Sequence, residues 1–208
     1  MTIFSPNMLK TFEQCQKKYY LKYIERISVP QKAGNFEKGK KIHALAHYYL
    51  RGDDTAGLET ALTEEEYRIW EQLKANEYFQ KTYINSEYNL SCKTGDFWVG
   101  GRLDALMRGS ESYYILDYKT GAIPKNPESD FQTTVYLLAA EKLYTPLQFV
   151  YIDLKNNQSR LIEFNNEIKS GYEKAIIDIC TQITNAKNFE DFEASKKCEF
   201  CEFKKICL

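Results

Sequence analysis

Apolar residues recur every three to four positions in several stretches of the chain, a spacing that predicts amphipathic helices. Ser5-Pro6 is typical of a helix N-cap followed by proline, so we expect the first helix to run from there to about Arg26, with Cys15 inside it. Thr63 is followed by three glutamates, a pattern typical of a capping box. The other helices are expected over residues 36–50, 63–80, 129–144 and 166–186.

Apolar and polar residues alternate in the second part of the chain, which predicts strands. These strands are expected over residues 82–92, 97–107, 113–119, 147–154 and 159–164. The strands expected over 97–107 and 113–119 flank a short polar gap at residues 108–111, so we expect them to form a hairpin that brings Asp104 close to Asp117. Because side chains two apart on a strand share a face, Asp117 and Lys119 should point the same way and Tyr118 the opposite way.

The order of these elements predicts an α/β fold with a mixed sheet flanked by helices. The chain has 208 residues, of which 43% are hydrophobic, so it can bury one sizeable core and form a single domain over 1–208. Within it we expect a helical lobe over 1–81, an α/β core over 82–187 and a cysteine-rich tail over 188–208.

Charge and apolar content bear on partners and location. The net charge is −1, yet ten basic and only three acidic residues lie within 1–51; this region could face an anionic ligand, although a solvated helix face is the commoner role of such a run. The chain has no signal-peptide pattern and no apolar run long enough to span a bilayer. We therefore expect a cytoplasmic protein without a membrane partner, in which thiols stay reduced.

Three of the six cysteines lie within ten residues of the C-terminal tail. Cys198 and Cys201 have the spacing of a metal-binding turn, and Cys207 can close on them. Cys15 is the best candidate for a fourth ligand, since Cys92 lies on a predicted strand and Cys180 lies inside a predicted helix. Spacing alone favours zinc over an iron–sulfur cluster, and free thiols are the alternative.

Asp104, Asp117 and Lys119 form the second group with chemical potential. Two close carboxylates repel each other unless a divalent cation binds both, and such a cation also activates water. A nearby lysine can then orient the attacking water or stabilise the transition state. Taken singly, such a pair of aspartates and a lysine more often forms an ordinary polar strand face. Residues such as His43, Gln132 and Tyr136, taken singly, more often have a structural role. Glu87 is a further acid on a neighbouring strand.

Taken in order, these residues form a series of motifs. The series consists of the opening stretch 4–15, Gly39-Lys-Lys-Ile-His43, Gly101-Arg-Leu-Asp104, Asp117-Tyr-Lys119-Thr-Gly and Gln132-Thr-Thr-Val-Tyr136. With these motifs, nearly the whole chain resembles the RecB-type branch of the PD-(D/E)xK nuclease superfamily. It is similar in particular to the iron–sulfur subset that includes AddB-type nuclease domains and the CRISPR-adaptation nucleases.

The resemblance implies a restriction-endonuclease-like core and a set of functional residues. The implied ligands of Mg²⁺ or Mn²⁺ are His43, Asp104, Asp117 and the backbone carbonyl of Tyr118. The implied catalytic residues are Asp104, Asp117, Lys119, Gln132 and Tyr136, with Lys119 positioning the water and the last two orienting Lys119 or the substrate.

The resemblance also changes the metal expected at the cysteines from zinc to a [4Fe–4S] cluster. The implied cluster ligands are Cys15, Cys198, Cys201 and Cys207. Because the overall charge is mildly acidic, DNA binding would depend on a local basic groove. The candidate DNA-binding residues are Lys17, Lys18, Lys22, Lys40 and Lys41.

The expected function is metal-dependent hydrolysis of DNA, as an exonuclease acting on single-stranded ends, in DNA repair and recombination or in CRISPR adaptation. A helicase or an integrase is the expected partner protein. The alternative is a non-catalytic iron–sulfur module that binds DNA for such a partner. A zinc-containing interaction protein without nucleic acid is the third hypothesis, and the colour of the purified protein would distinguish it.

Overall fold

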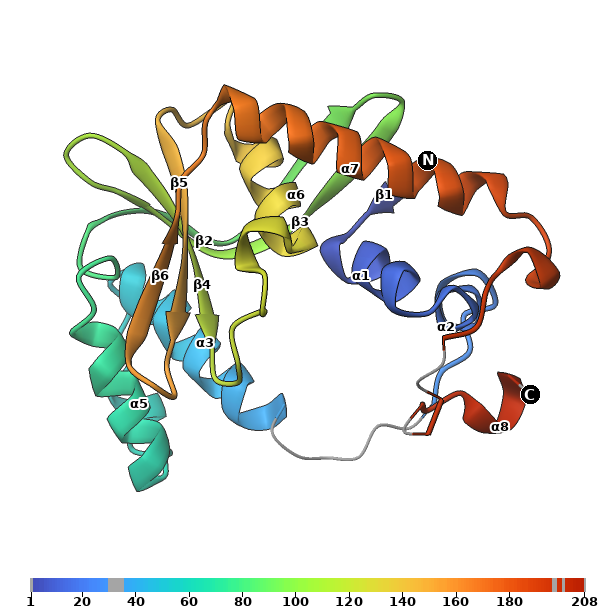
Figure 1. Cartoon of the computed structure of the whole chain (residues 1–208). Helices are drawn as coiled ribbons and strands as arrows, with labels where there is room; N and C mark the ends of the chain where they lie inside the picture. Colours follow the sequence, from blue (N-terminus) through green and yellow to red (C-terminus); the bar gives the residue numbers. More distant parts are fainter. Residues whose placement is uncertain (1, 30–35, 196–197, 200, 208) are drawn as a thin grey trace.

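A six-stranded mixed sheet with helices on both faces forms the centre of the molecule (Figure 1). The computed structural model describes residues 2–29, 36–195, 198–199 and 201–207, with the side chains of 36–38 left out. The strands are β1 (Ile3–Phe4), β2 (Thr82–Thr94), β3 (Phe97–Arg108), β4 (Tyr113–Lys119), β5 (Leu147–Asp153) and β6 (Gln158–Ile162). The predicted α/β fold with a mixed central sheet is confirmed.

The helices fall into long packing helices and short connecting turns. The longer helices are α1 (Pro6–Gln14), α3 (Phe36–Leu50), α5 (Glu64–Lys74), α6 (Phe131–Ala140) and α7 (Asn166–Asn185). The short segments are α2 (Gln16–Tyr19), the π-helix η1 (Tyr20–Ile24), α4 (Ala56–Glu59), η2 (Pro127–Ser129), η3 (Phe189–Asp191) and α8 (Lys204–Cys207). No helix in the described part of the chain has both the length and the apolar composition needed to cross a membrane.

Strand β3 is the centre of the sheet because it pairs with three other strands. Strand β2 lies antiparallel to it along most of its length, and β4 pairs antiparallel with its last residues, with Ala105 opposite Leu116. The short β1 pairs parallel with its beginning, at Ile3 and Trp98. Strand β5 then adds parallel to β4, and β6 antiparallel to β5.

Two hydrophobic clusters cover the two faces of the sheet. One contains Leu106 and Ile115 of the sheet with residues of α1, α6 and α7. The other contains Leu116 and Tyr118 of the sheet with residues of α3 and α5. Side chains on β4 therefore alternate between the faces as predicted, and the side of β4 that faces α6 also carries the polar residues of the motif.

Three predicted helices end earlier than their periodicity indicated, among them α6, which ends at Ala140 rather than near residue 144. The first is interrupted at Cys15, whose backbone is extended (φ −166°, ψ 110°), and the chain continues as α2 and a π-helix. The prediction that Cys15 lies inside a continuous helix is therefore wrong. Helix α5 ends at Lys74 rather than near residue 80, because the Asn76 side chain accepts a hydrogen bond from the Tyr78 backbone and favours a turn.

Candidate active site

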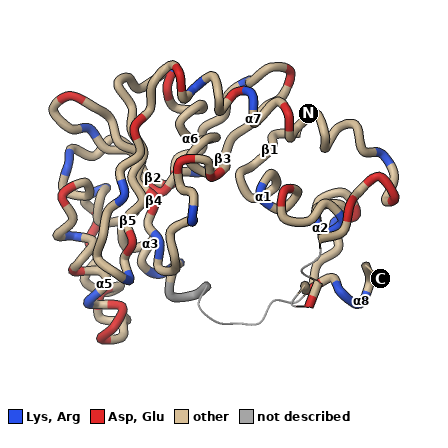
Figure 2. The backbone as a smooth tube through the Cα atoms, in the orientation of Figure 1, with Lys and Arg blue, Asp and Glu red and all other residues tan. Residues whose placement is uncertain are grey.

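The β3–β4 hairpin brings the two motif aspartates together. Asp104 on β3 accepts a hydrogen bond from the backbone N–H of Tyr118 through Oδ2 (2.9 Å), which places it beside the end of β4. Asp117 is 3% exposed, and its Oδ2 lies 2.7 Å from the ammonium of Lys119. The pairing of Ala105 with Leu116 sets this register, as the hairpin prediction required. Acidic positions accordingly meet in the middle of the molecule, near the labels of β2 and β4 (Figure 2).

Gln132 joins both charged groups of the Asp-x-Lys motif. Its Oε1 accepts a hydrogen bond from Lys119 Nζ (2.8 Å), and its Nε2 donates to Asp117 Oδ1. The side chain lies in the first turn of α6, where its own backbone N–H donates to the N-cap residue Asp130 (3.0 Å). The amide thus fixes the lysine and the aspartate relative to each other.

Tyr136 lies one turn further along α6 and contacts the backbone of β3. Its hydroxyl donates a hydrogen bond to the carbonyl of Arg102 (2.7 Å). A Cβ at Gly101 would lie 2.9 Å from the Tyr136 ring, which explains why glycine precedes the Arg-Leu-Asp104 sequence. Tyr136 therefore holds α6 against the strand that carries Asp104.

His43 reaches the same place from α3 on the other face of the sheet. Its Nδ1 lies 3.2 Å from Asp104 Oδ1, and its Nε2 lies 3.0 Å from the Tyr118 carbonyl. A Cβ at Gly39, one turn earlier, would lie 3.2 Å from the Thr120 hydroxyl, so glycine lets α3 approach the end of β4. The Gly-x-x-x-His spacing thus serves close packing and places the imidazole.

The charges of this site shift two pKa values upward. Burial by itself lowers the pKa of His43, but the hydrogen bond with Asp104 and the charges of Asp104 and Asp117 raise it to about 9. Burial and the charge of Asp104 raise the pKa of Asp117 to about 7, against the opposing effect of Lys119. His43 and Asp117 thus retain protons that a bound cation would displace.

The donor set and its geometry fit a divalent cation. Ligand atoms of His43, Glu87 and Asp104 lie within 4.8 Å of one another. Among the described residues, Asp117 Oδ2 is buried without a hydrogen-bond partner, although the Lys119 ammonium lies 2.7 Å away as an ion pair. Carboxylate oxygens and one imidazole are ligands that Mn²⁺ and Mg²⁺ sites use.

A cleft of about 1250 Å³ opens directly onto these residues. His43 and Asp104 lie on its wall, and it extends between α3, α5, the middle of β2 and β3, and the residues that follow β4 and β5. Its basic lining residues are Lys40, Arg68, Arg102 and Lys155. An anionic chain can therefore approach the acidic group along a partly basic surface.

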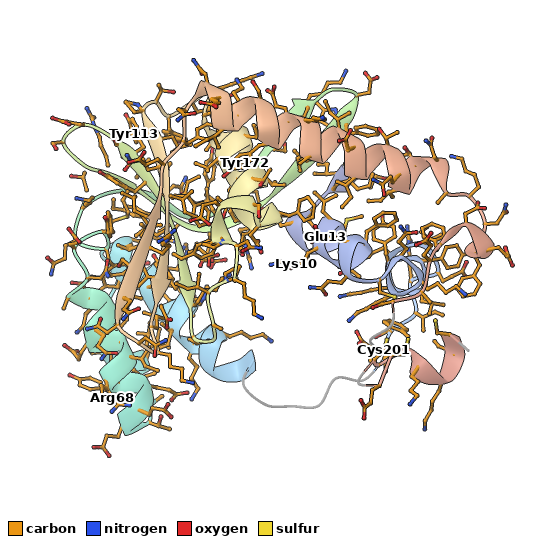
Figure 3. The ribbon with its side chains drawn as sticks, viewed as in Figure 1. Lys10, Glu13, Arg68, Tyr113, Tyr172 and Cys201 are labelled. Atoms are coloured by element: carbon orange, nitrogen blue, oxygen red, sulfur yellow. The ribbon has the colours of Figure 1, made fainter. Side chains whose placement is uncertain are left out.

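The four predicted cluster cysteines line one smaller cavity of about 300 Å³. Cys15 accepts a hydrogen bond from the Ser195 backbone N–H (3.4 Å), and the Cys198 thiol donates to the Ser195 carbonyl (3.0 Å). Cys201 lies in the C-terminal segment beside α2 and α8 (Figure 3). By contrast, Cys180 is buried in α7, and burial raises the pKa of its thiol to about 12. The extended backbone at Cys15 thus accompanies the convergence of these thiols.

The five lysines predicted to bind DNA lie in different surroundings. Lys17 and Lys22 lie over the rings of Phe189 and Tyr23, at 4.6 and 5.2 Å from the ring centres. Lys18 pairs with Glu202 (3.0 Å) and Lys41 with Glu66 (3.1 Å). Of the five, Lys40 lines the large cleft.

A sequence profile of the PD-(D/E)XK nuclease superfamily matches residues 3–93 and 69–208, almost the whole chain. The chain belongs to this superfamily. PD-(D/E)XK nucleases act on DNA and use divalent metal ions, which agrees with the donor set of His43, Asp104 and Glu87.

Two curated proteins and one solved structure are similar to this chain. The chain is 22% identical to the CRISPR-associated exonuclease Cas4 of Francisella tularensis subsp. novicida over an alignment of 154 residues. This alignment covers 72% of this chain and 78% of the relative. It is 31% identical over 115 residues to the RecBCD enzyme subunit RecB of Borreliella burgdorferi, covering 53% of this chain but 9% of that subunit. A crystal structure of a candidate exonuclease from Eubacterium rectale has the same fold, with a TM-score of 0.59, 13% identity and coverage of 98% and 87% of the two chains.

Sequence reasoning missed one ion pair that supports this PD-(D/E)XK site. Lys10 of α1 lies 2.6 Å from Asp130, whose side chain is 6% exposed and caps α6 (Figure 3). The capping pattern of Asp130 could have been found from the sequence, since aspartate two residues before Gln132 is a typical N-cap. Its partner Lys10 could not, because the contact joins distant parts of the chain.

Proposed function

We propose that this protein is a metal-dependent nuclease that degrades DNA from single-stranded ends. The observation that carries the proposal is the convergence of His43, Asp104, Asp117 and Lys119 beside a partly basic cleft. The similarity to an exonuclease named for CRISPR and to a RecB subunit supports an exonuclease in CRISPR adaptation or in DNA repair and recombination.

The proposed metal ligands are His43, Asp104, Asp117 and the Tyr118 carbonyl. His43 and the Tyr118 carbonyl are 3.0 Å apart, and Asp104 contacts both residues. A bound Mg²⁺ or Mn²⁺ would lower the pKa of a coordinated water and polarise the phosphoryl group. The imidazole makes Mn²⁺ a good fit, because nitrogen ligands suit it better than they suit Mg²⁺.

Lys119 is the proposed positioning group for the attacking water. Its ammonium is held between Asp117 and Gln132, so it has a fixed direction when substrate arrives. It would donate to the water or to the phosphate oxygens as negative charge develops. Water oxygen then bonds to phosphorus, the phosphorus–oxygen bond to the neighbouring nucleoside breaks, and the leaving oxygen takes a proton. Through its hydrogen bond to the Arg102 carbonyl, Tyr136 would hold α6, and with it Gln132, in a fixed position against β3.

A single strand of DNA is the proposed occupant of the cleft. Lys40, Arg68 and Lys155 would contact phosphates along its walls. Tyr48 also lines the cleft and is 42% exposed, so its ring can stack on an unpaired base. Lys17, Lys18, Lys22 and Lys41 are further proposed DNA contacts outside the cleft; of these, Lys17 and Lys18 lie at the cysteine cavity.

We propose a [4Fe–4S] cluster as the occupant of the cysteine cavity. Its donor set fits, because four thiols line one cavity whose other walls include Lys17 and Phe203. The cluster would have a structural role, because it would join Cys15, the residue after α1, to the C-terminal tail. Zinc remains the alternative metal for a four-thiol site.

The chain would act as one nuclease domain over 1–208, with the lobe 1–81, the core 82–187 and the tail 188–208 as its parts. The pairing of β1 with β3 and the packing of α3 and α5 on the sheet support a single domain. A helicase or integrase partner and a cytoplasmic location remain predictions from the sequence; one relative is itself named as a subunit of the RecBCD enzyme.

The experiment that tests the function is degradation of end-labelled DNA by anaerobically purified protein. Single-stranded and duplex substrates are incubated with Mn²⁺, Mg²⁺ or EDTA. We expect shortening of the single strand with either metal, faster with Mn²⁺, and none with EDTA. If folded, brown protein binds the strand without shortening it under any condition, the non-catalytic binding module is the correct account.

A further inference from the structure

The start of helix α6 carries a buried carboxylate whose partner comes from a distant part of the chain. The Asp130 side chain is 6% exposed, and its Oδ2 lies 2.6 Å from the ammonium of Lys10 on α1. Lys10 points from α1 toward the segment that precedes α6 (Figure 3). A buried carboxylate is unfavourable unless it is paired and hydrogen-bonded. Lys10 therefore compensates a negative charge that water reaches only slightly.

Asp130 connects Lys10 to Gln132 through its second carboxylate oxygen. Its Oδ1 accepts a hydrogen bond from the Gln132 backbone N–H (3.0 Å), in the manner of an N-cap. The Gln132 side chain in turn accepts a hydrogen bond from Lys119 Nζ (2.8 Å) and donates one to Asp117. A continuous series of polar contacts thus runs from α1 to the ammonium that is proposed to position the attacking water.

The opposite side of the first turn of α6 is fixed by buried contacts. The Thr133 hydroxyl donates a hydrogen bond to the Pro127 carbonyl (2.7 Å) and lies 2.9 Å from the Tyr151 hydroxyl of β5. Thr133 and Tyr151 are fully buried, whereas the Lys10 side chain is 35% exposed. Without Lys10, the turn would therefore shift on its α1 side, where water can reach it, and not on its β5 side.

We propose that Lys10 is a positioning residue for DNA hydrolysis, which acts on Lys119 through Asp130 and Gln132. The inference rests on the proposed function, because it concerns the rate at which the same site cleaves DNA. The described lining of the cleft does not include Lys10, so this residue acts on the geometry of the site and not on the strand. A shift of the Gln132 amide would move the Lys119 ammonium, and a displacement of about 1 Å can lower a catalytic rate about a hundred-fold.

The test is the kcat and KM of single-stranded DNA degradation with Mn²⁺ by Lys10→Met, which keeps the length of the side chain and removes its charge. We expect kcat to fall by roughly ten- to a hundred-fold while KM stays nearly unchanged. Lys10→Arg retains a cation for Asp130 and should recover most of the wild-type kcat. Lys174→Met, at an exposed position of α7, is the matched control and should leave both constants unchanged.

The same change in a Gln132→Ala background separates positioning from a purely structural role. If Lys10 acts through Gln132, Lys10→Met lowers the rate no further once the amide is gone, although it still lowers the melting temperature. Equal fold losses of rate in both backgrounds would show a general structural effect and overturn the proposal. A loss confined to KM would show that Lys10 contacts the DNA, and would overturn it as well.

Asp130→Asn provides a second variant, which keeps the N-cap because asparagine caps a helix about as well as aspartate does. It removes the charge that attracts Lys10, so we expect a loss of kcat of the same order as in Lys10→Met. This variant decides the question if thermal unfolding shows that Lys10→Met is not folded. An unchanged kcat in Asp130→Asn would refute the positioning role.

The outcome is separable from that of the proposed function. DNA shortening by the wild type, with an unchanged kcat in folded Lys10→Met, would refute the role of Lys10 and leave the nuclease intact. If the wild type shortens no DNA, the proposed function fails, and the positioning role fails with it.

Discussion

At the scale of single residues, the site depends on side chains that each contact two partners. His43 contacts Asp104 through one nitrogen and the Tyr118 carbonyl through the other, and Gln132 contacts both Asp117 and Lys119. Such paired contacts fix the orientation of an imidazole or an amide more strongly than one contact does. These contacts therefore hold the His43 imidazole and the Gln132 amide in defined orientations.

The raised pKa of His43 predicts how stability of the metal-free protein varies with pH. The folded protein binds this proton with a pKa of about 9, against about 6.5 in an unfolded chain. The resulting stabilisation is fully present below about pH 6.5 and is lost as pH rises through about 9. In EDTA, the melting temperature should fall over this interval, and it should fall less in His43→Asn.

Thermal unfolding from pH 6 to pH 9.5 checks this prediction. His47→Asn is the control, because His47 lies one turn away on α3 and contacts Ser86 instead of Asp104. Equal pH dependence in the wild type and His43→Asn would show that His43 is not the protonated group.

At the scale of elements, α6 is the element that aligns the site. Its N-cap residue Asp130 accepts a hydrogen bond from the Gln132 backbone N–H and forms an ion pair with Lys10 of α1. Tyr136 attaches the same helix to β3 through a hydrogen bond. The hydrophobic cluster around Val135 buries its remaining face. Helix α6 thus links the N-terminal helices to the strand pair that carries Asp104 and Asp117.

Asp130→Ala tests this role of α6. The variant loses an N-cap and leaves Lys10 without its partner, so the free energy of unfolding should fall by about 1–2 kcal/mol. Urea unfolding measures the change. Glu13→Ala, at an exposed position of α1 (Figure 3), should change it by no more than about 0.5 kcal/mol. A loss in Asp130→Ala as small as in the control would contradict the role.

Local patterns predicted the hairpin of β3 and β4, because alternation and a short gap determine its register. They also predicted the N-cap at Ser5 and the capping box at Thr63, which the structure confirms. They failed at Cys15, where the backbone becomes extended, and at the end of α5, where Asn76 favours a turn over the helix. Glu87 was named from the sequence as a further acid on a neighbouring strand, but its left-handed backbone was beyond sequence reasoning, since no local pattern marks it.

At the scale of the whole molecule, the segment around Cys15 and the C-terminal tail share a cavity, although they lie far apart in the sequence (Figure 1). Pairing these parts through a cluster would hold the N-terminal helices in place against the sheet. Aromatic contacts of Tyr20 with Phe189 and Phe192 support the same region. A cluster in this cavity would couple metal content to the position of α1.

Cys201→Ser tests the cluster and its structural role. We expect anaerobically purified wild type to be brown, with a broad band near 400 nm, and the variant to lose iron, colour and thermal stability together. Cys92→Ser, on β2 away from this cavity, should keep all three. Colourless wild type containing zinc would refute the cluster, and a colourless variant of unchanged stability would refute its structural role.

The most direct test of the central claim is the rate at which Lys119→Ala degrades end-labelled single-stranded DNA with Mn²⁺, compared with the wild type. Removing the ammonium that Asp117 and Gln132 hold should slow cleavage by about a hundred-fold or more, with little change in DNA binding. Lys174→Ala, an exposed position on α7, is the control. Equal rates in wild type and Lys119→Ala would contradict the claim that this site hydrolyses DNA.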